Sequence, residues 1–437
     1  MGIRIFLLTI ILINTVFAIN AQTTKDEMIA NPNKTGGVYY AYPTPSSAVT
    51  PAPKGYKPFY ISHYGRHGSR YLISTKDYTN LKDQLHNAYD AGALTPFGVE
   101  IMNRLDTVMI EADGRGGDLA PLGVRQHREI AERMVNSYPE VFQDSTNISA
   151  RSTLVVRCVL SMDAFCERLK EINPSLQIIR EASQKYMPYL CYGSPESDEK
   201  RKEISEEKRK FKNQMTHPER LIDTLFFDKE YVRKNLNPED FMWGMYYLAS
   251  DMQNMETPIS FYDVFTPDEL FDLWQVFNFD FYSGSANYKG SDGLMIANAG
   301  NLLNNIMDSA EIALDNDSPS ATLRFGHDGN LIPLAGILEF PSAIGSNDSP
   351  SDAYKYFADY KVAPMAGNIQ IIFYKNEASP DAPVLVKFLL NEEEQIIPIE
   401  PVDWPYYDWE AVKAHYRHSK FLQTNKSTLN DQASKTF

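Results

Sequence analysis

Short apolar runs that end in a polar turn recur along this chain. One lies at residues 59–61, a second ends near residue 150, and a third spans 320–325. This pattern is typical of buried strands that lead into a turn. Two later runs, 368–374 and 383–391, predict a further pair of strands, which we expect to be antiparallel neighbours that close the sheet.

The patterns between these runs are mainly helical. Thr95 followed by Pro96 predicts a helix start, because Thr caps the first turn and Pro fits the first helical position. The mixed-charge run at 196–209 is most simply a solvated helix. Further helical patterns occupy 76–91, 119–138, a segment from about 153, 238–252, 266–277, 294–314, a segment that ends near 338, and part of 404–417.

No alternating strand pattern appears between about 195 and 315. We therefore predict an α/β fold in which one domain, formed by residues 58–190 and 316–437, is interrupted by an α-helical insertion or cap at 191–315. Such an insertion commonly forms the wall of a substrate pocket, because it can vary without disturbing the sheet.

The N-terminal segment has two parts. Residues 1–21 combine a basic start at Arg4 with an apolar stretch and small residues at Ala18 and Ala21, which predicts a signal peptide too short to be a convincing membrane span. We place cleavage after Ala21, with Ala18 as the alternative, and expect a periplasmic or secreted protein with no membrane span after cleavage. Residues 22–57 are rich in Pro, Gly, Ser and Thr and predict an extended lead-in rather than a packed element.

Composition excludes several classes of protein. The 437 residues are 43% hydrophobic and 23% charged, which is typical of a globular protein and argues against disorder and coiled coil. A formal charge of −15 argues against nucleic acid as a general partner, because a phosphate backbone requires a basic surface. Three cysteines cannot all pair within one chain, so the fold does not depend on a disulfide framework. The Cys-His spacing of a metal site is absent.

The most informative stretch is Arg66-His67-Gly68-Ser69-Arg70, which follows the first apolar run. The carboxyl end of a parallel strand is where an α/β sheet places its ligand. Arg66 and Arg70 carry fixed charges suited to phosphate oxygens, and Gly68 lets the backbone approach an anion. His67 between them would be a nucleophile or base aimed at whatever the arginines hold. The alternative is a surface turn with solvated arginines.

This stretch resembles the R-H-G-x-R signature of the histidine acid phosphatases, the family that includes phytases and multiple inositol polyphosphate phosphatases. Residues 119–127 are similar to the family's L-T-x-x-G-x-x-Q helix, with Ala120 where Thr is usual. Residues 151–161 match a family run of the form R-S-T-x-x-x-R-x-x-x-S. By that match Arg157 is the third phosphate-holding arginine. A lone arginine here would more simply be a surface residue paired with an acidic side chain.

His327 and Asp328 follow the apolar run at 320–325 and resemble the family's second signature, an H-D turn with a nearby Asn. The surrounding residues are closer to the inositol polyphosphate phosphatase branch, which commonly has H-A-E. Here Asp328 replaces the Ala and Gly329 replaces the Glu, so an acid that acts from this loop must be Asp328. The alternative is a capping aspartate beside a packed histidine.

The resemblance implies a phosphoglycerate-mutase-like sheet flanked by helices and a two-step hydrolysis of phosphomonoesters. The three arginines would bind the phosphoryl oxygens, His327 would donate to one of them, and His67 would attack phosphorus. Asp328 would protonate the leaving alkoxide and then help to activate water. This mechanism implies no metal and no other cofactor.

The expected partner is a phosphorylated small molecule, and the contexts of residues 66–71 and 325–327 favour inositol polyphosphates such as phytate. Lys76 is close enough in sequence to reach a second phosphate, and an ordinary solvated lysine is the alternative. Other possibilities are a general or sugar-phosphate acid phosphatase, a mutase of the same superfamily, and a catalytically silent phosphate-ester-binding protein. Arg70 and the signal peptide argue against the mutase, and the retained nucleophile and acid argue against the silent protein.

Overall fold

The computed structural model describes residues 24–45, 47–419, 421 and 422, so the predicted signal peptide lies outside the described residues. A single sheet forms the centre of this part of the chain. Its strands are β1 Tyr56–Arg66, β2 Asn147–Ser152, β3 Gln177–Ala182, β4 Ala321–Gly326, β5 Asn368–Asn376, β6 Leu385–Leu390, β7 Glu393–Glu394 and β8 Tyr407–Asp408. Their order is β3-β2-β4-β1-β5-β6-β7, with β8 paired to β6.

Strand β1 joins a parallel half of the sheet to an antiparallel half. On one side it pairs in parallel with β4, which is followed by β2 and then β3, all parallel. On the other side it pairs antiparallel with β5, which pairs antiparallel with β6, as expected for the runs at 368–374 and 383–391. The sequence pattern does not reveal β3, because this edge strand leaves most of its side chains exposed.

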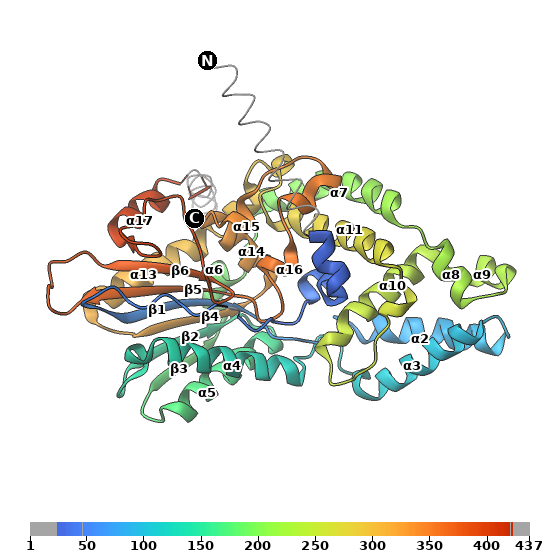
Figure 1. Cartoon of the computed structure of the whole chain (residues 1–437), viewed down its shortest axis with the longest axis horizontal. Coiled ribbons are helices and arrows are strands. Elements are labelled where there is room, and N and C mark those ends of the chain that lie inside the picture. The colour runs from blue at the N-terminus through green and yellow to red at the C-terminus, as the bar shows by residue number, and fades with distance from the viewer. Residues whose placement is uncertain (1–23, 46, 420, 423–437) are drawn as a thin grey trace, which may run out of the picture.

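Helices cover both faces of the sheet (Figure 1). These helices are α4 Pro121–Ser137, α5 Val156–Ile172, α13 Gly300–Asn316, α14 Asp328–Ile337 and α17 Trp409–Arg417. Successive side chains of a strand point to opposite faces. Tyr60 accordingly packs with α13, α14 and α17, whereas Ile61 packs with α4 and α5. The predicted α/β fold is confirmed.

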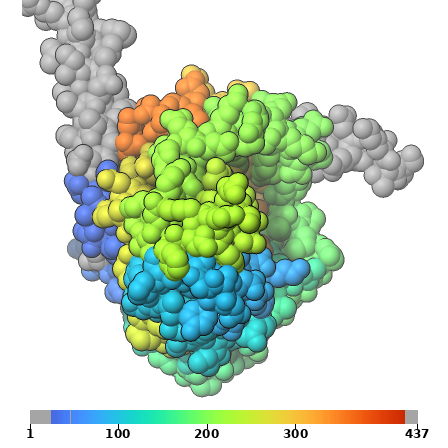
Figure 2. Space-filling view, turned by 90° about the vertical axis from the view of Figure 1, so that its right-hand side faces the viewer, coloured from blue at the N-terminus to red at the C-terminus, as the bar shows by residue number. Residues whose placement is uncertain are grey.

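A second group of helices has a hydrophobic core of its own. It consists of α2 Thr75–Asp90, α3 Pro96–Ala112, α8 Glu219–Leu225, α9 Lys229–Asn235, α10 Pro238–Asp251 and α11 Pro267–Ser285, which we call the cap. Figure 2 shows the blue surface of α2 and α3 against the yellow-green surface of α8 to α10.

The extent of the cap differs from the predicted boundaries in two ways. Helices α2 and α3 precede residue 191 and yet pack with the cap, whereas α13 lies within the predicted cap range and packs on the sheet. The physical reason is that periodicity shows that a helix has an apolar face but not which surface that face will cover.

The lead-in also differs from the extended segment that its composition predicts. Pro32–Tyr39 forms a 3-10 helix, η1, most of which is buried against the cap. A Cβ at Gly37 would lie 2.3 Å from the carboxylate of Asp359, so the close packing of η1 requires a glycine there. The composition identifies residues that form turns, but tertiary contacts bury them.

The remaining helices are short or lie over the sheet and the cap. They are α6 Met187–Leu190, α7 Pro195–Met215, α12 Leu294–Ala297, α15 Pro341–Ile344 and α16 Asp359–Val362, with 3-10 helices η2 Pro139–Phe142, η3 Gln184–Tyr186, η4 Met252–Asn254, η5 Tyr262–Val264, η6 Lys289–Ser291 and η7 Pro350–Lys355. The helix expected at 294–314 is divided between α12 and α13. Within the described ranges, no helix has the length and apolar character needed to cross a membrane.

Candidate active site

The carboxyl ends of β1, β2 and β4 meet at one edge of the sheet. Backbone hydrogen bonds continue this pairing beyond the strands. The N–H of His67 donates to the carbonyl of Gly326 at 3.0 Å, and the N–H of Thr153 donates to the carbonyl of Phe325 at 3.0 Å. Since these strands lead into the three sequence motifs, the sheet brings the motifs together, at the edge where α/β sheets hold their ligands.

Neighbouring helices fix the backbone of the first motif. The N–H of Gly68 donates to Oγ of Ser161 at 3.1 Å, and the N–H of Ser69 donates to Oε1 of Gln126 at 2.8 Å. Gly68 also lies against α4, where a Cβ on Gly68 would be 2.5 Å from the carbonyl oxygen of Gly123. A side chain at Gly68 would separate the loop from the helix, so this glycine is needed for close approach.

His67 presents a neutral ring with one free nitrogen. The side chain is 2% exposed, and its Nδ1 lies 2.9 Å from the carbonyl oxygen of Gly68. A carbonyl oxygen only accepts hydrogen bonds, so Nδ1 carries the proton and Nε2 keeps its lone pair. Burial and the positive charges of three arginines lower the pKa of His67 well below 6.5. These arginines are Arg66, Arg70 and Arg157.

Arg66 is completely buried and forms an ion pair with Asp328, in which Nη2 lies 2.8 Å from Oδ2. Its Nη1 donates to the backbone carbonyls of Val38, at 2.5 Å, and Ala363, at 2.8 Å. Burial raises the pKa of Asp328, but nearby positive charges, that of Arg66 foremost, outweigh burial and hold the pKa below 3.8. Asp328 is therefore a carboxylate at neutral pH when no substrate is bound.

Asp328 also supports the start of α14. Its Oδ1 accepts a hydrogen bond from the N–H of Gly329 at 2.7 Å, within the first turn of the helix. An acidic side chain at this position is stabilised by the helix dipole. The side chain of Asp328 thus makes both the contact within α14 and the ion pair with Arg66. A capping aspartate and a carboxylate of the site, the two interpretations drawn from the sequence, are therefore compatible.

Arg70 is held by the lead-in and the cap. It is 5% exposed and lies over the ring of Tyr39, 4.7 Å from the ring centroid. Its Nη1 donates to the carbonyl of Tyr71 at 2.8 Å. Asp251, at the end of α10, is close enough to attract Arg70 electrostatically and accepts a hydrogen bond from the hydroxyl of Tyr78 at 2.5 Å. Burial raises the pKa of Asp251 to about 6.

Arg157 completes the set of arginines from the first turn of α5. Arg66, Arg70 and Arg157 each have a buried Nε–H that makes no hydrogen bond within the described residues. Buried donors are almost always satisfied in proteins. Three unsatisfied cationic donors around a neutral imidazole therefore indicate a site for an anion, which would also offset the repulsion among the guanidinium groups.

His327 lies beside His67, with 5.7 Å between the ring centroids. Its Nε2 is 3.3 Å from the hydroxyl of Thr153 and 3.6 Å from the sulfur of Cys158. Burial lowers the pKa of His327 to about 4, although the nearby Asp328 acts in the opposite direction. The ring is therefore neutral at pH 7, and a neutral imidazole still has one N–H to donate.

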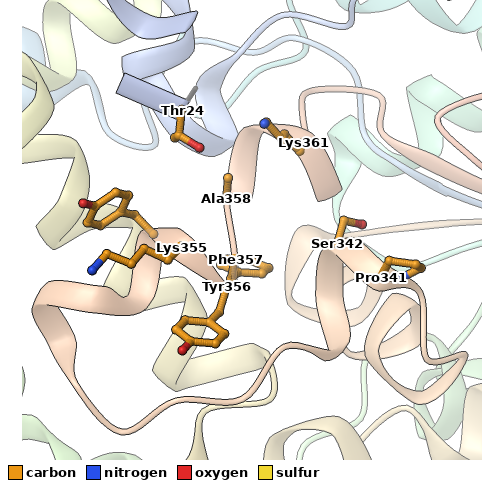
Figure 3. Close-up of a pocket in the computed structure, with 9 residues that line it drawn as sticks. Thr24, Pro341, Ser342, Lys355, Tyr356, Phe357, Ala358 and Lys361 are labelled. Carbon is orange, nitrogen blue, oxygen red and sulfur yellow. The ribbon is translucent and has the colours of Figure 1, made fainter. Parts of the chain in front are cut away.

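Lys76 differs from the other predicted site residues in its exposure. Its side chain is exposed in the first turn of α2, whereas the other six converge at the edge of the sheet. A cavity of about 280 Å³, shown in Figure 3, lies between η7, α15 and α16 and is lined by residues such as Ser342, Lys355 and Lys361. None of the predicted site residues lines this cavity, so it is separate from the cluster.

Three further residues of the site come from segments without a motif: Tyr39, Asp251 and Asn254. Asn254 accepts a hydrogen bond from the hydroxyl of Ser69 at 2.7 Å and donates to the carbonyl of Tyr39 at 3.0 Å. Tyr39 lies in the lead-in, Asp251 ends α10 and Asn254 ends η4, and folding alone brings them to the motif at residues 66–70. The single sequence signal was the acidic Asp251, which follows the apolar stretch 241–249.

Comparison with models of known protein families identifies the family of this chain. The model of the histidine phosphatase superfamily, branch 2, matches residues 65–391. The chain belongs to the histidine phosphatase superfamily. The matched range contains all three motifs, and the resemblance found in the sequence is confirmed. Among curated proteins, no relative matches this chain.

Solved structures share the fold of this histidine phosphatase at low sequence identity. A multiple inositol polyphosphate phosphatase from Bifidobacterium longum, in complex with phosphate, has a TM-score of 0.71 and 18% identity over 88% of this chain and 98% of its own. The phytase from D. castellii has a TM-score of 0.65 and 15% identity over 88% and 84%. Hafnia alvei phytase, in complex with tartrate, has a TM-score of 0.53 and 13% identity over 84% and 98%.

The charges of this histidine phosphatase site lead to a prediction about His67. We expect its imidazole to remain neutral between about pH 5 and 8, because burial and three arginines oppose protonation. In Arg157→Gln one positive charge is lost, and the pKa of His67 should rise. NMR of 15N-labelled histidine measures both values, and the spectrum of His67→Gln assigns the signal. A wild-type His67 that titrates near 6.5, as free histidine does, would contradict this account.

Proposed function

We propose that this protein hydrolyses phosphomonoesters through a phosphohistidine at His67. The observation that carries the proposal is a neutral imidazole, with Nε2 free, beside three arginines whose buried Nε–H groups lack partners. A phosphoryl group supplies acceptors for these donors and the negative charge that offsets their repulsion. Membership in the histidine phosphatase superfamily supports the same reaction.

In the first step, Nε2 of His67 attacks phosphorus in line with the leaving oxygen. The P–N bond forms as the P–O bond to the leaving group breaks, and the three arginines neutralise the charge spread over the non-bridging oxygens. The N–H of His327 donates to one of these oxygens. Asp328 gives its proton to the leaving alkoxide, which departs as the alcohol.

This role requires a protonated Asp328, although the pKa of its carboxyl lies below 3.8 before substrate binds. A bound phosphoryl group competes for Arg66 and adds negative charge nearby, and both effects raise the pKa of the carboxyl. In the second step the carboxylate of Asp328 takes a proton from water. The hydroxyl attacks phosphorus, the P–N bond breaks, and His67 is released together with inorganic phosphate.

Inositol polyphosphates are the substrate class that we propose. The Bifidobacterium longum multiple inositol polyphosphate phosphatase was also solved in complex with inositol hexasulfate, with a TM-score of 0.67 to this chain. Hafnia alvei phytase was solved in complex with myo-inositol hexakis sulphate, with a TM-score of 0.52. Both ligands carry six anionic groups on one small ring, as inositol hexakisphosphate does.

A cavity of about 300 Å³ between α7, α10 and α11 supports a substrate with several phosphates. Lys212 lines this cavity, half-buried and 4.9 Å from the ring centroid of Trp243. Phe277 lines it too, and its ring is 6.0 Å from that of Tyr39, which in turn underlies Arg70. Helix α7 therefore offers a cation beyond the three arginines. Lys76 remains a hypothesis for a further phosphate contact.

Export is part of this proposal and rests on the pattern at residues 1–21. The expected site of action is the periplasm or the exterior of the cell.

The first test concerns the covalent intermediate. His67→Ala should lower kcat by at least about 10³-fold, as loss of a covalent nucleophile does in other enzymes. Brief incubation of the wild type with a labelled phosphomonoester, followed by a quench in base, should leave label on the protein, because phosphohistidine survives alkali. His86→Ala, at a half-exposed histidine that pairs with Asp106, is the control and should keep full activity. Turnover by His67→Ala near the wild-type rate would exclude His67 as the nucleophile.

The second test concerns the acid. Asp328→Asn should slow hydrolysis of a poor leaving group, such as an inositol alkoxide, far more than that of a nitrophenolate, because only the poor leaving group needs a proton in the transition state. With the poor leaving group, wild-type kcat/KM should fall about tenfold for each pH unit from the acidic range upward, because kcat/KM reports the free enzyme, in which the pKa of Asp328 lies below 3.8. Equal losses for both substrates would assign Asp328 to the support of α14 alone.

The third test concerns the substrate. Inositol hexakisphosphate and a sugar monophosphate are compared under the same conditions, with products separated by ion exchange. We expect preferential cleavage of the hexakisphosphate, and Lys212→Ala should raise its KM by about threefold without changing that of the monophosphate. Cleavage of the monophosphate alone would overturn the substrate class but not the reaction. Binding of either compound without cleavage would identify a silent phosphate-ester-binding protein.

A further inference from the structure

The orientation of Arg66 depends on two backbone carbonyls that lie outside every sequence motif. Nη1 donates to the carbonyl of Val38, in η1, at 2.5 Å and to that of Ala363, directly after α16, at 2.8 Å. One of these residues precedes Arg66 in the chain, and the other follows it by 297 positions. The guanidinium is completely buried, so no water replaces these contacts if the carbonyls move.

The buried residue Asp359 bonds to both of these residues, to Val38 through its carboxylate and to Ala363 through its backbone carbonyl. Oδ2 of Asp359 accepts the N–H of Val38 at 3.1 Å, and the backbone carbonyl of Asp359 accepts the N–H of Ala363 at 2.8 Å. Its second carboxylate oxygen, Oδ1, accepts Nε1–H of Trp274 at 3.0 Å and the N–H of Tyr360 at 2.9 Å. Asp359 is 0% exposed, and the three bonds to its carboxylate hold the side chain in one orientation.

The chain before Val38 is shaped to reach this carboxylate. Gly37 has φ +56° and ψ −124°, a conformation that residues with a Cβ rarely adopt. A Cβ at this position would lie 2.3 Å from Oδ2 of Asp359, well inside van der Waals contact. Glycine therefore permits both the backbone conformation and the bond between Val38 and Asp359.

We propose that Asp359 is a positioning residue for phosphate binding, whose carboxylate sets the orientation of Arg66 through Val38. The proposal rests on the function proposed above, in which Arg66 binds the phosphoryl group. An arginine can stabilise a transition state only if its donors face the oxygens that gain charge, and small displacements of such groups reduce rates strongly. Asp359 acts through backbone contacts and does not itself touch the phosphoryl group.

Asp359→Asn separates this role from a general contribution to folding. A carboxamide has one acceptor oxygen and one NH₂ group. Placed at the Oδ1 position, the oxygen keeps the bonds from Trp274 and Tyr360, which leaves the NH₂ group facing the N–H of Val38. Two donors then oppose each other, so the substitution removes the bond to η1 while it keeps the packing volume.

The experiment compares three variants of the full-length protein. Asp359→Asn and Gly37→Ala disturb the same hydrogen bond from its two sides. Glu394→Gln is the matched control, because Glu394 also accepts an N–H from the lead-in, that of Thr50 at 2.7 Å, at the far edge of the sheet. Thermal unfolding and circular dichroism establish that each variant is folded. Activity is measured with p-nitrophenyl phosphate, and the affinity for inorganic phosphate is measured by calorimetry.

We expect kcat/KM and phosphate affinity to fall at least about tenfold in Asp359→Asn and in Gly37→Ala, and to stay within about twofold of the wild type in Glu394→Gln even if its thermal stability falls equally. If Asp359→Asn or Gly37→Ala is folded and keeps wild-type phosphate affinity, the positioning role is wrong. It is also wrong if Glu394→Gln loses as much phosphate affinity as these two variants. A wild type that binds phosphate but hydrolyses no ester would overturn the proposed function, and the phosphate affinities would still decide the role of Asp359.

Discussion

A completely buried arginine at the end of the central strand is the constraint on which the rest of the structure depends. Removing a guanidinium group from water carries a free-energy penalty on the order of several kcal/mol unless charged or polar partners replace the water. Arg66 finds one carboxylate, from Asp328, and two backbone carbonyls, from Val38 and Ala363. These partners come from three distant parts of the chain. The lead-in, the first turn of α14 and the end of α16 must therefore all be in place before Arg66 makes these three contacts.

The same buried charges account for the chemistry of the site. The positive charges that would bind a phosphoryl group also lower the pKa of His67, so anion binding and an unprotonated nucleophile arise from one arrangement. The whole chain carries a formal charge of −15, opposite in sign to the cluster. Attraction for an anionic substrate is consequently local, and it depends on burial, because exposed charges would be screened by water and salt. The fold places the charges of the three arginines together at the edge of the sheet, where they act on a bound group at close range.

The parts of the site that could be predicted are those that lie next to a strand in the sequence. Arg66 and His327 follow directly from β1 and β4, so a motif and a strand pattern together indicate where they meet. Tyr39 and Asp251 reach Arg70, and Asp359 reaches Val38, only through the packing of the lead-in, α10 and α16. The local pattern of apolar residues does not predict such contacts. It shows which face of a helix or strand is apolar but not which element packs against that face. The α/β fold was predictable because most of its strands and helices have apolar patterns of their own. The extent of the cap was not predictable, because it depends on which helices pack together.

The first turn of α14 contains a position whose side chain is not fixed by packing. A Cβ at Gly329 would meet no other atom within 4 Å, so packing does not require glycine at this position. The open space adjoins Asp328, the proposed acid, which must face the leaving group. A larger residue at 329 would fill space near the leaving group without disturbing the sheet, the arginines or His67. On the mechanism proposed above, the reaction would depend on the buried frame around Arg66, and the choice of leaving group would depend on side chains at its margin, which can change independently.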